Sequence, residues 1–175
     1  MKKTIIVNLF AGPGAGKSTG ASYVFSKLKM EGFDAEYVSE FAKDMVWENN
    51  SKAFNCQFYI TGNQVFRIYK VYGEVDVIVT DSPIALGVFY SGQDKLNLAI
   101  LEEFKKYNNL NFFINRKKEF NSNGRNQTEQ ESIDIDKDIL KLLNDNNIEF
   151  TKVDGDSEGY DQIIEIVKSH IDNKK

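Results

Sequence analysis

A glycine-rich loop that carries a lysine and a serine is the part of this chain best suited to chemistry. Residues 5–19 read IIVNLFAGPGAGKST, an apolar run followed by the pattern A/G-x4-G-K-S/T. In this pattern the glycines bring backbone N–H groups against phosphate oxygens, the lysine reaches the β- and γ-phosphates, and the hydroxyl binds magnesium. The motif therefore predicts binding of ATP together with Mg²⁺.

The loop and the first turn of the helix after it are expected to form the phosphate site. The predicted cofactor-binding residues are Gly12, Pro13, Gly14, Ala15, Gly16, Lys17, Ser18 and Thr19. Lys17 is also predicted to act in catalysis, and Ser18 to be a magnesium ligand. Ala11 replaces the usual first glycine, which is tolerated if its φ is negative.

A second carboxylate is expected to reach the same site. Residues 74–83 read EVDVIVTDSP, a buried strand with Asp81 at its carboxyl end. Parallel strands gather their carboxyl ends at one edge of a sheet, where open α/β sheets bind ligands. Asp81 is therefore predicted to be a magnesium ligand and a catalytic residue. Asp76 competes for this role, but it stands at the opposite end of the strand.

Glu40 is the candidate for contact with a phosphoryl acceptor. It follows a short strand predicted at 35–38, so it lies at the same sheet edge. There it could hold substrate hydroxyls or act as a catalytic base. The alternative is a surface acid in the first turn of a helix that Ser39 caps.

A long helix is predicted over residues 51–72. Its buried stripe is predicted to be Phe54, Phe58, Val65, Ile68 and Tyr72, from their helical spacing. Gln57 and Gln64 fall on a neighbouring face and are predicted to bind substrate. Arg67 shares that face, which could line a pocket. The alternative is a solvated polar face, an interpretation that is favoured more for Arg67 than for the two glutamines.

A polar and basic connection, residues 116–127, is predicted to form a lid. It reads RKKEFNSNGRNQ and follows a strand predicted at 110–115. Arginine placed over a transferring phosphoryl group stabilises its charge, so Arg116 and Arg125 are predicted to be catalytic. Lys117 and Lys118 are interpreted as ordinary solvated residues.

Strand-like and helix-like segments alternate along the chain. Strands are predicted near 3–10, 35–38, 75–79, 110–115 and 148–153, and Thr128 with Glu131 predicts a capping box at the start of a later helix. The predicted fold is α/β, a three-layer sandwich with a five-stranded parallel sheet, of the P-loop NTPase and nucleoside-nucleotide kinase type. Residues 1–175 are expected to form a single domain.

Composition sets the wider expectations. The chain has 175 residues, 41% of them hydrophobic and 27% charged, which is typical of a globular protein. Its net charge of −4 disfavours a general nucleic-acid-binding surface, and no segment is predicted to span a membrane. The single cysteine, Cys56, is expected to be buried and fits a reducing cytoplasm. The sequence leaves the oligomeric state open.

Several motifs together resemble a known family. AGPGAGKST, VSEFAKD, Gln57 and Gln64, VTDSP and an arginine-bearing connection with NGR are similar to the small AAA-type P-loop kinases grouped with the nicotinamide-ribonucleoside kinase domain of bacterial NAD-biosynthesis regulators. Many members are encoded by bacteriophages. The resemblance implies that Glu40 and Asp81 approach the substrate and the metal, and that Arg125 belongs to a lid.

These observations predict an ATP- and Mg²⁺-dependent kinase that acts on a small nucleoside-like or nucleotide-like acceptor. Two other functions use the same loop. One is an ATP-dependent switch or partner-binding ATPase, and the other is a nucleic-acid end kinase, which the net acidity disfavours. Fold class alone does not choose among them.

Overall fold

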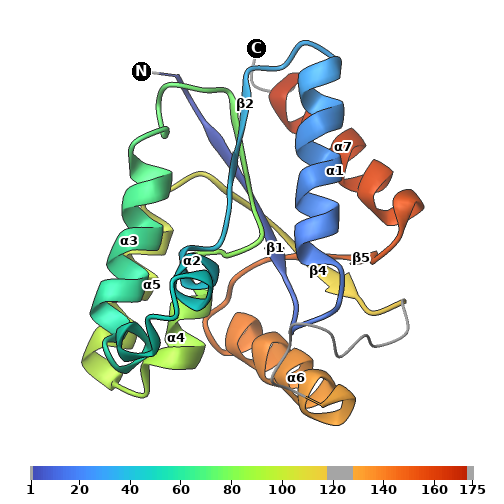
Figure 1. The fold of residues 1–175 in the computed structure, drawn as a ribbon. Helices are drawn as coiled ribbons and strands as arrows, with labels where there is room; N and C mark the ends of the chain where they lie inside the picture. The colour runs from blue at the N-terminus through green and yellow to red at the C-terminus, as the bar shows by residue number, and fades with distance from the viewer. Residues whose placement is uncertain (1, 118–127, 173–175) are drawn as a thin grey trace.

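Five strands form one all-parallel sheet in the order β2-β3-β1-β4-β5 (Figure 1). The computed structural model describes residues 2–117 and 128–172. The strands are β1 (Ile5–Phe10), β2 (Ala35–Val38), β3 (Val77–Thr80), β4 (Asn109–Asn115) and β5 (Thr151–Asp154). In register, Val7 on β1 stands beside Val79 on β3 and Leu110 on β4. The strand that enters the glycine-rich loop is thus the centre of the sheet.

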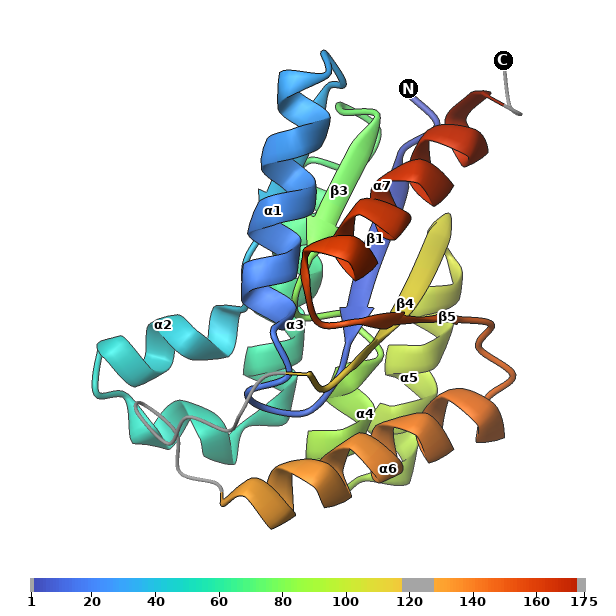
Figure 2. The ribbon, with the colours of Figure 1, turned by 90° about the vertical axis from the view of Figure 1, so that its right-hand side faces the viewer.

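Helices connect the strands and cover both faces of the sheet (Figure 2). They are α1 (Lys17–Met30), α2 (Phe41–Trp47), the 3₁₀ helix η1 (Ser51–Asn55), α3 (Gln57–Tyr69), α4 (Leu86–Ser91), α5 (Asp94–Lys105), α6 (Glu129–Asp145) and α7 (Ser157–Asp172). The predicted α/β fold with a five-stranded parallel sheet is confirmed.

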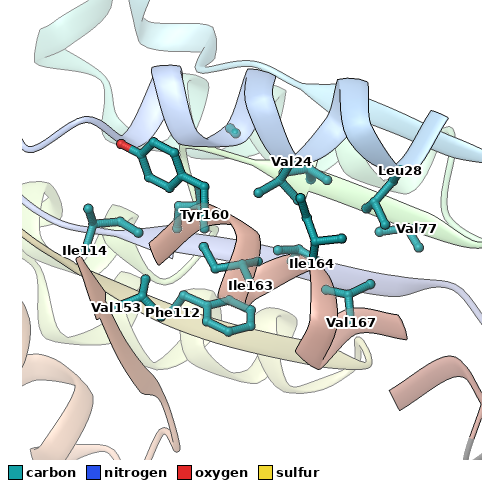
Figure 3. Close-up of a cluster of buried hydrophobic side chains, with 14 of the residues drawn as sticks. Val24, Leu28, Val77, Phe112, Ile114, Val153, Tyr160, Ile163, Ile164 and Val167 are labelled. Atoms are coloured by element: carbon teal, nitrogen blue, oxygen red, sulfur yellow. The ribbon is translucent and has the colours of Figure 1, made fainter. Parts of the chain in front are cut away.

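Alternating side chains of β1 divide the core into two layers. Ile5, Val7 and Leu9 pack with residues of α1 and α7, including Val24 and Ile163 (Figure 3). The remaining apolar side chains of β1 pack on the other face with residues of α3, α4, α5 and α6. Because a strand turns successive side chains to opposite faces, an almost continuous apolar run is what a central strand between two helical layers requires.

The carboxyl ends of all five strands meet at one edge of the sheet because the strands are parallel. The glycine-rich loop follows β1, Asp81 follows β3, and Arg116 follows β4. Asp76 precedes β3, and Lys2 forms an ion pair with it at 3.4 Å. The structure thus places Asp76 at the edge opposite to the loop, as its position in the strand predicted.

The prediction for residues 51–72 is wrong in two respects. The segment is broken into η1 and α3 at Cys56, rather than one helix. Phe54 and Phe58, predicted to be buried, are exposed, whereas Ile68 is buried and Val65 and Tyr72 pack against the core as predicted. The residues that α3 buries include two polar ones: Ile60, Thr61, Gln64 and Ile68. The segment has so many aromatic residues that several faces of a helix look apolar in the sequence. Only one of these faces packs against the core.

Local signals elsewhere had mixed outcomes. The capping box is confirmed, since the Thr128 side chain accepts a hydrogen bond from the Glu131 N–H and the Glu131 side chain accepts one from the Thr128 N–H. Ser39 does not cap α2, because Glu40 occupies the N-cap position. Cys56 is exposed rather than buried.

Across the described part of the chain, no helix has the length and apolar character needed to cross a membrane.

Candidate functional site

The glycine-rich loop has the backbone that its glycines predict. Gly14 and Gly16 have φ values of 79° and 102°, in the left-handed region that a side chain disfavours. Gly16 is the N-cap of α1, and no side chain among the described residues caps this helix. The N–H groups of its first turn are therefore available to an anion, and the helix dipole favours negative charge there. Ser18 and Thr19 lie on this turn and are exposed.

The Lys17 amine lies against the loop itself. Its Nζ donates hydrogen bonds to the carbonyl oxygens of Ala11, at 2.6 Å, and Gly12, at 3.1 Å. Burial lowers the pKa of this amine, and the negative charges of Glu40, Asp81 and Asp136 act against that shift. These carboxylates come from three separate connections or helices, so the fold gathers negative charge around the one lysine.

Asp81 and Glu40 lie near Lys17. Asp81 is buried, and its Oδ1 has no hydrogen-bond partner among the described residues. Burial raises the pKa of the Glu40 carboxyl, the Lys17 charge opposes this, and the Asp81 charge adds to it. A buried carboxylate oxygen without a hydrogen-bond partner is energetically costly. Such an oxygen is typical of a site where a bound ligand or metal ion supplies the missing partner.

A magnesium ion fits this donor set. Mg²⁺ is bound in nucleotide sites through one or two protein oxygens, with phosphates and water completing an octahedron. The unpartnered Oδ1 of Asp81 and the exposed hydroxyl of Ser18 are oxygens of this kind. Within residues 2–117 and 128–172 there is no group of three or more His, Cys, Asp or Glu that could hold a metal.

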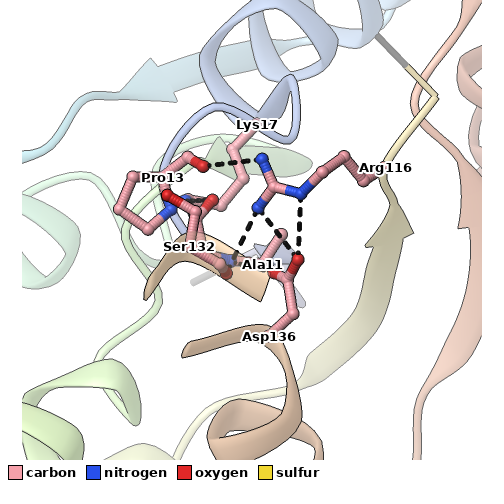
Figure 4. A network of polar contacts seen from close by, with 7 residues as sticks. Ala11, Pro13, Lys17, Arg116, Ser132 and Asp136 are labelled. Atoms are coloured by element: carbon pink, nitrogen blue, oxygen red, sulfur yellow. Dashed lines mark hydrogen bonds and ion pairs between the residues drawn. The ribbon is translucent and has the colours of Figure 1, made fainter. Parts of the chain in front are cut away.

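Arg116 is held between the loop and α6 (Figure 4). Its Nη2 and Nε donate to Asp136 Oδ2, at 2.9 and 3.2 Å, and its Nη1 donates to the Pro13 carbonyl at 2.9 Å. Asp136 also accepts a hydrogen bond from the Gly12 N–H at 2.5 Å, through Oδ1. The arginine predicted to be catalytic thus contacts the phosphate loop, and Asp136 links both groups.

The family of the chain follows from a comparison with known proteins. Residues 6–159 match a family model, AAA_28, which is described as an AAA domain. The chain belongs to this AAA domain family. The match begins in β1 and ends in α7, so it covers the sheet, the phosphate loop and Asp81. No curated protein matches the chain. This AAA domain is a P-loop domain of the nucleotide-binding type.

The two glutamines predicted to bind substrate have different surroundings in this AAA domain. Gln64 is buried, and its Oε1 accepts a hydrogen bond from the Phe41 N–H at 2.8 Å, while its Nε2 has no partner in the described residues. Gln57 donates from Nε2 to the Thr61 hydroxyl at 3.1 Å. Gln64 therefore holds the first residue of α2, immediately after Glu40, and a contact of either glutamine with substrate stays a prediction.

Arg67 fixes the same helix start from another side, and its interpretation as a solvated residue is wrong. Its guanidinium forms an ion pair with Asp44, donates to the Ser39 hydroxyl at 3.3 Å, and lies 5.0 Å from the ring centre of Phe41. Together with Gln64, these contacts make the backbone around Glu40 well defined.

Two tyrosines near the carboxylates escaped the sequence analysis. Burial raises the pKa of the Tyr37 hydroxyl, and the charge of Asp81 and a hydrogen bond with it add to the shift. Burial, with a contribution from Glu40, raises the pKa of Tyr90. Tyr37 is on β2 and Tyr90 on α4, so only the folded chain brings these phenols to the two carboxylates.

Asp136 and Tyr160 are further residues that the sequence did not identify. The Tyr160 hydroxyl donates to the Gly16 carbonyl at 3.0 Å, from the first turns of α7. Neither residue belongs to a motif, and a helical pattern alone gives no signal for such contacts.

The structure describes only the start of the predicted lid. Lys117 pairs with Asp154 at 2.9 Å. Arg125, Lys118 and the rest of the predicted lid at 118–127 lie outside the described residues.

Proposed function

We propose that this AAA domain is an ATP- and Mg²⁺-dependent kinase that transfers the γ-phosphoryl group to a small nucleoside-like or nucleotide-like acceptor. The observation that carries the proposal is the position of two carboxylates, Glu40 after β2 and Asp81 after β3, at the sheet edge of the phosphate loop, where the charges of both act on Lys17. A binding switch needs the lysine and one metal-binding carboxylate, whereas a kinase also needs a group that orients or deprotonates an acceptor.

The loop amides and Lys17 would hold the phosphates of ATP. The Lys17 amine is bound to two loop carbonyls, and a β- or γ-phosphate would offer it a stronger, charge-assisted partner. Ser18 and Asp81 would hold the magnesium ion, which neutralises charge on the phosphates when bound. The Arg116 guanidinium, already beside Pro13, would lie close to the same phosphates.

Transfer requires an acceptor oxygen in line with the γ-phosphorus. The acceptor hydroxyl forms the new P–O bond, the bond from the γ-phosphorus to the β–γ bridging oxygen breaks, and ADP leaves with that electron pair. Glu40 or Asp81 would receive the hydroxyl proton. Burial raises the pKa of Glu40, which brings it closer to the range of an effective general base.

The groups around Glu40 favour an acceptor that presents hydroxyls rather than a phosphate. Glu40, Asp81, Tyr37 and Tyr90 are carboxylates and phenols that influence one another electrostatically. Carboxylates accept hydrogen bonds from sugar hydroxyls and repel an anionic group. Arg67, the arginine of α3, is already paired with Asp44. A nucleoside therefore suits this environment better than a nucleoside monophosphate.

The decisive experiment measures ATP turnover with Mg²⁺, alone and with a panel of acceptors, following both ADP and phosphorylated product. The panel contains nucleosides, their monophosphates, nicotinamide riboside and 5′-hydroxyl oligonucleotides. We expect ADP and phosphorylated product to rise together with one nucleoside. ADP formed at the same slow rate with every acceptor would instead support the switch or partner-binding ATPase. Phosphorylation of oligonucleotides alone would support the nucleic-acid end kinase.

A further inference from the structure

Helix α3 has two apolar faces, and the monomer buries only one. On the buried face, Ile68 packs into the core that covers the sheet, and Ile60 packs with Phe41 and Met45 of α2. On the opposite side, Phe58, Phe66 and Tyr69 are 64%, 62% and 66% exposed. Together with Gly62, they lie at spacings of four, four and three residues, which places all four on one side of a helix. We call these four residues the outer stripe.

Gly62 lies at the centre of the outer stripe, where neither crowding nor backbone conformation requires a glycine. A Cβ atom added there would meet nothing within 4 Å, and no positive φ requires glycine at this position. Glycine in an exposed helix interior weakens the helix relative to alanine. A glycine between two aromatic residues, one turn to either side, is what a close approach by a second backbone requires.

We propose that the outer stripe is the interface of a homodimer in which two α3 helices cross antiparallel at Gly62. A two-fold axis through Gly62 brings Phe58 of one copy against Phe66 of the other, because both lie four residues from the axis. This is the self-complementarity that a two-fold interface demands of a single surface. The proposal is independent of the kinase function.

The exposed area agrees with a stable dimer. An aromatic side chain carries roughly 200 Å² of surface, so the exposed parts of Phe58, Phe66, Tyr69 and the adjacent Tyr59 amount to about 450 Å². A standard interface buries about 800 Å² per partner, of which somewhat more than half is apolar. The outer stripe would thus supply the apolar centre of an interface of ordinary size.

Charge also favours a second copy as the occupant. The outer stripe carries no charged residue, so two chains of net charge −4 can meet there without placing like charges at the centre. The face of α3 that bears Gln64 turns the other way and stays with α2. Dimerisation therefore leaves the phosphate loop open, and Figure 1 shows α3 at the outer edge of the molecule, away from α1 and α7.

Sedimentation velocity without nucleotide tests the proposal. The wild-type chain of 20.0 kDa is expected to sediment with twice that mass at micromolar concentration. Phe66→Glu should weaken association about thirty-fold or more, because it places a charge in the centre of the interface. Leu98→Glu is the matched control, since Leu98 on α5 is also 66% exposed but lies outside the outer stripe, and it should remain dimeric.

Gly62→Ala separates the interface from folding. In the monomer the methyl group has room and improves helix propensity, so the melting temperature of dilute protein should rise by about 2–4 °C. In the dimer the same methyl group separates the crossing helices and should weaken association. A wild-type chain that stays monomeric at about 100 µM, a dimer that survives Phe66→Glu, or a monomer that binds single-stranded oligonucleotides through these aromatics would each overturn the proposal.

Discussion

Asp136 and Arg116 form an ion pair with 2.9 Å between Oδ2 and Nη2, and both side chains are largely withdrawn from solvent. The pair does more than join α6 to the end of β4. Through Asp136 Oδ1 it reaches the Gly12 N–H, and through Arg116 Nη1 it reaches the Pro13 carbonyl. Two successive residues of the phosphate loop are therefore fixed by one ion pair.

Asp136→Ala is expected to lower the free energy of unfolding by about 2–4 kcal/mol, because it leaves a shielded guanidinium without its charged partner and the Gly12 N–H without its acceptor. Urea denaturation measures the change. Asp134→Ala is the control on the same helix. Asp134 pairs with Lys137 in an exposed position, so this variant should unfold at nearly the same urea concentration as the wild type. Equal losses of stability in the two variants would contradict the conclusion that the Asp136–Arg116 ion pair holds the phosphate loop.

Lys17→Ala is expected to abolish turnover, with a loss of at least about a hundredfold, since no other described cation is bound to the Ala11 and Gly12 carbonyls. Circular dichroism should show an intact fold. Lys29→Ala, on the exposed side of the same helix, should retain full activity. Unimpaired turnover in the Lys17 variant would remove the basis of the whole site assignment.

Asp81→Asn should weaken Mg²⁺-dependent ATP binding by at least about tenfold while leaving the unliganded protein folded. The reason is that Asp81 Oδ1 has no partner among the described residues, and an amide at this position still offers an oxygen to the Tyr37 hydroxyl. Calorimetric titration of ATP with and without Mg²⁺ gives the measurement. Asp76→Asn, at the other edge of the sheet, should bind as the wild type does. Loss of binding in that control instead would assign the metal to Asp76.

Glu40→Gln should change the pH dependence of stability. The folded-state pKa of Glu40 is raised above the ordinary value of 4.5, so above that pH the folded chain binds more protons at this site than the unfolded chain. Its contribution to stability is therefore present at low pH and is lost as pH rises through the folded pKa. Melting curves between about pH 4 and pH 8 should show the variant gaining on the wild type as pH rises. A constant difference would contradict the raised pKa.

Gly20→Ala should destabilise the protein by about 1–3 kcal/mol even though alanine favours helices, because the new methyl carbon would lie 2.5 Å from a ring carbon of Tyr160. Thermal unfolding provides the comparison. Ser26→Ala, exposed on the same helix, should be neutral or slightly stabilising. A Gly20→Ala protein as stable as the wild type would mean that α1 and α7 can separate there without cost.

The features that the sequence predicted correctly depend on residues close together in the chain or on where parallel strands end. The loop glycines, the capping box of Thr128 and Glu131, and the place of Asp81 each follow from residues a few positions apart, or from the rule that parallel strands end at one edge. The positions of these groups in the structure agree with those predictions. Their chemical roles stay predictions that the variants above examine.

Residues that act over long sequence separations could not be found in this way. Asp136 reaches Gly12 across 124 positions. Helix α6 has several other acidic residues, and nothing in the sequence distinguishes Asp136 from them. The error at Phe58 has a different cause. Helical spacing shows that residues share a face, but it does not say whether that face meets the chain's own core or another molecule.

The anchoring of the phosphate loop has a consequence for the order of events during synthesis. The loop leaves the ribosome before α6 and α7, but its Gly12 N–H is bound only when Asp136 arrives, and its Gly16 carbonyl only when Tyr160 arrives. A nascent chain that lacks α6 and α7 therefore carries the full nucleotide motif without the contacts that shape it. Nucleotide affinity should emerge abruptly once α7 has been synthesised and can pack against α1.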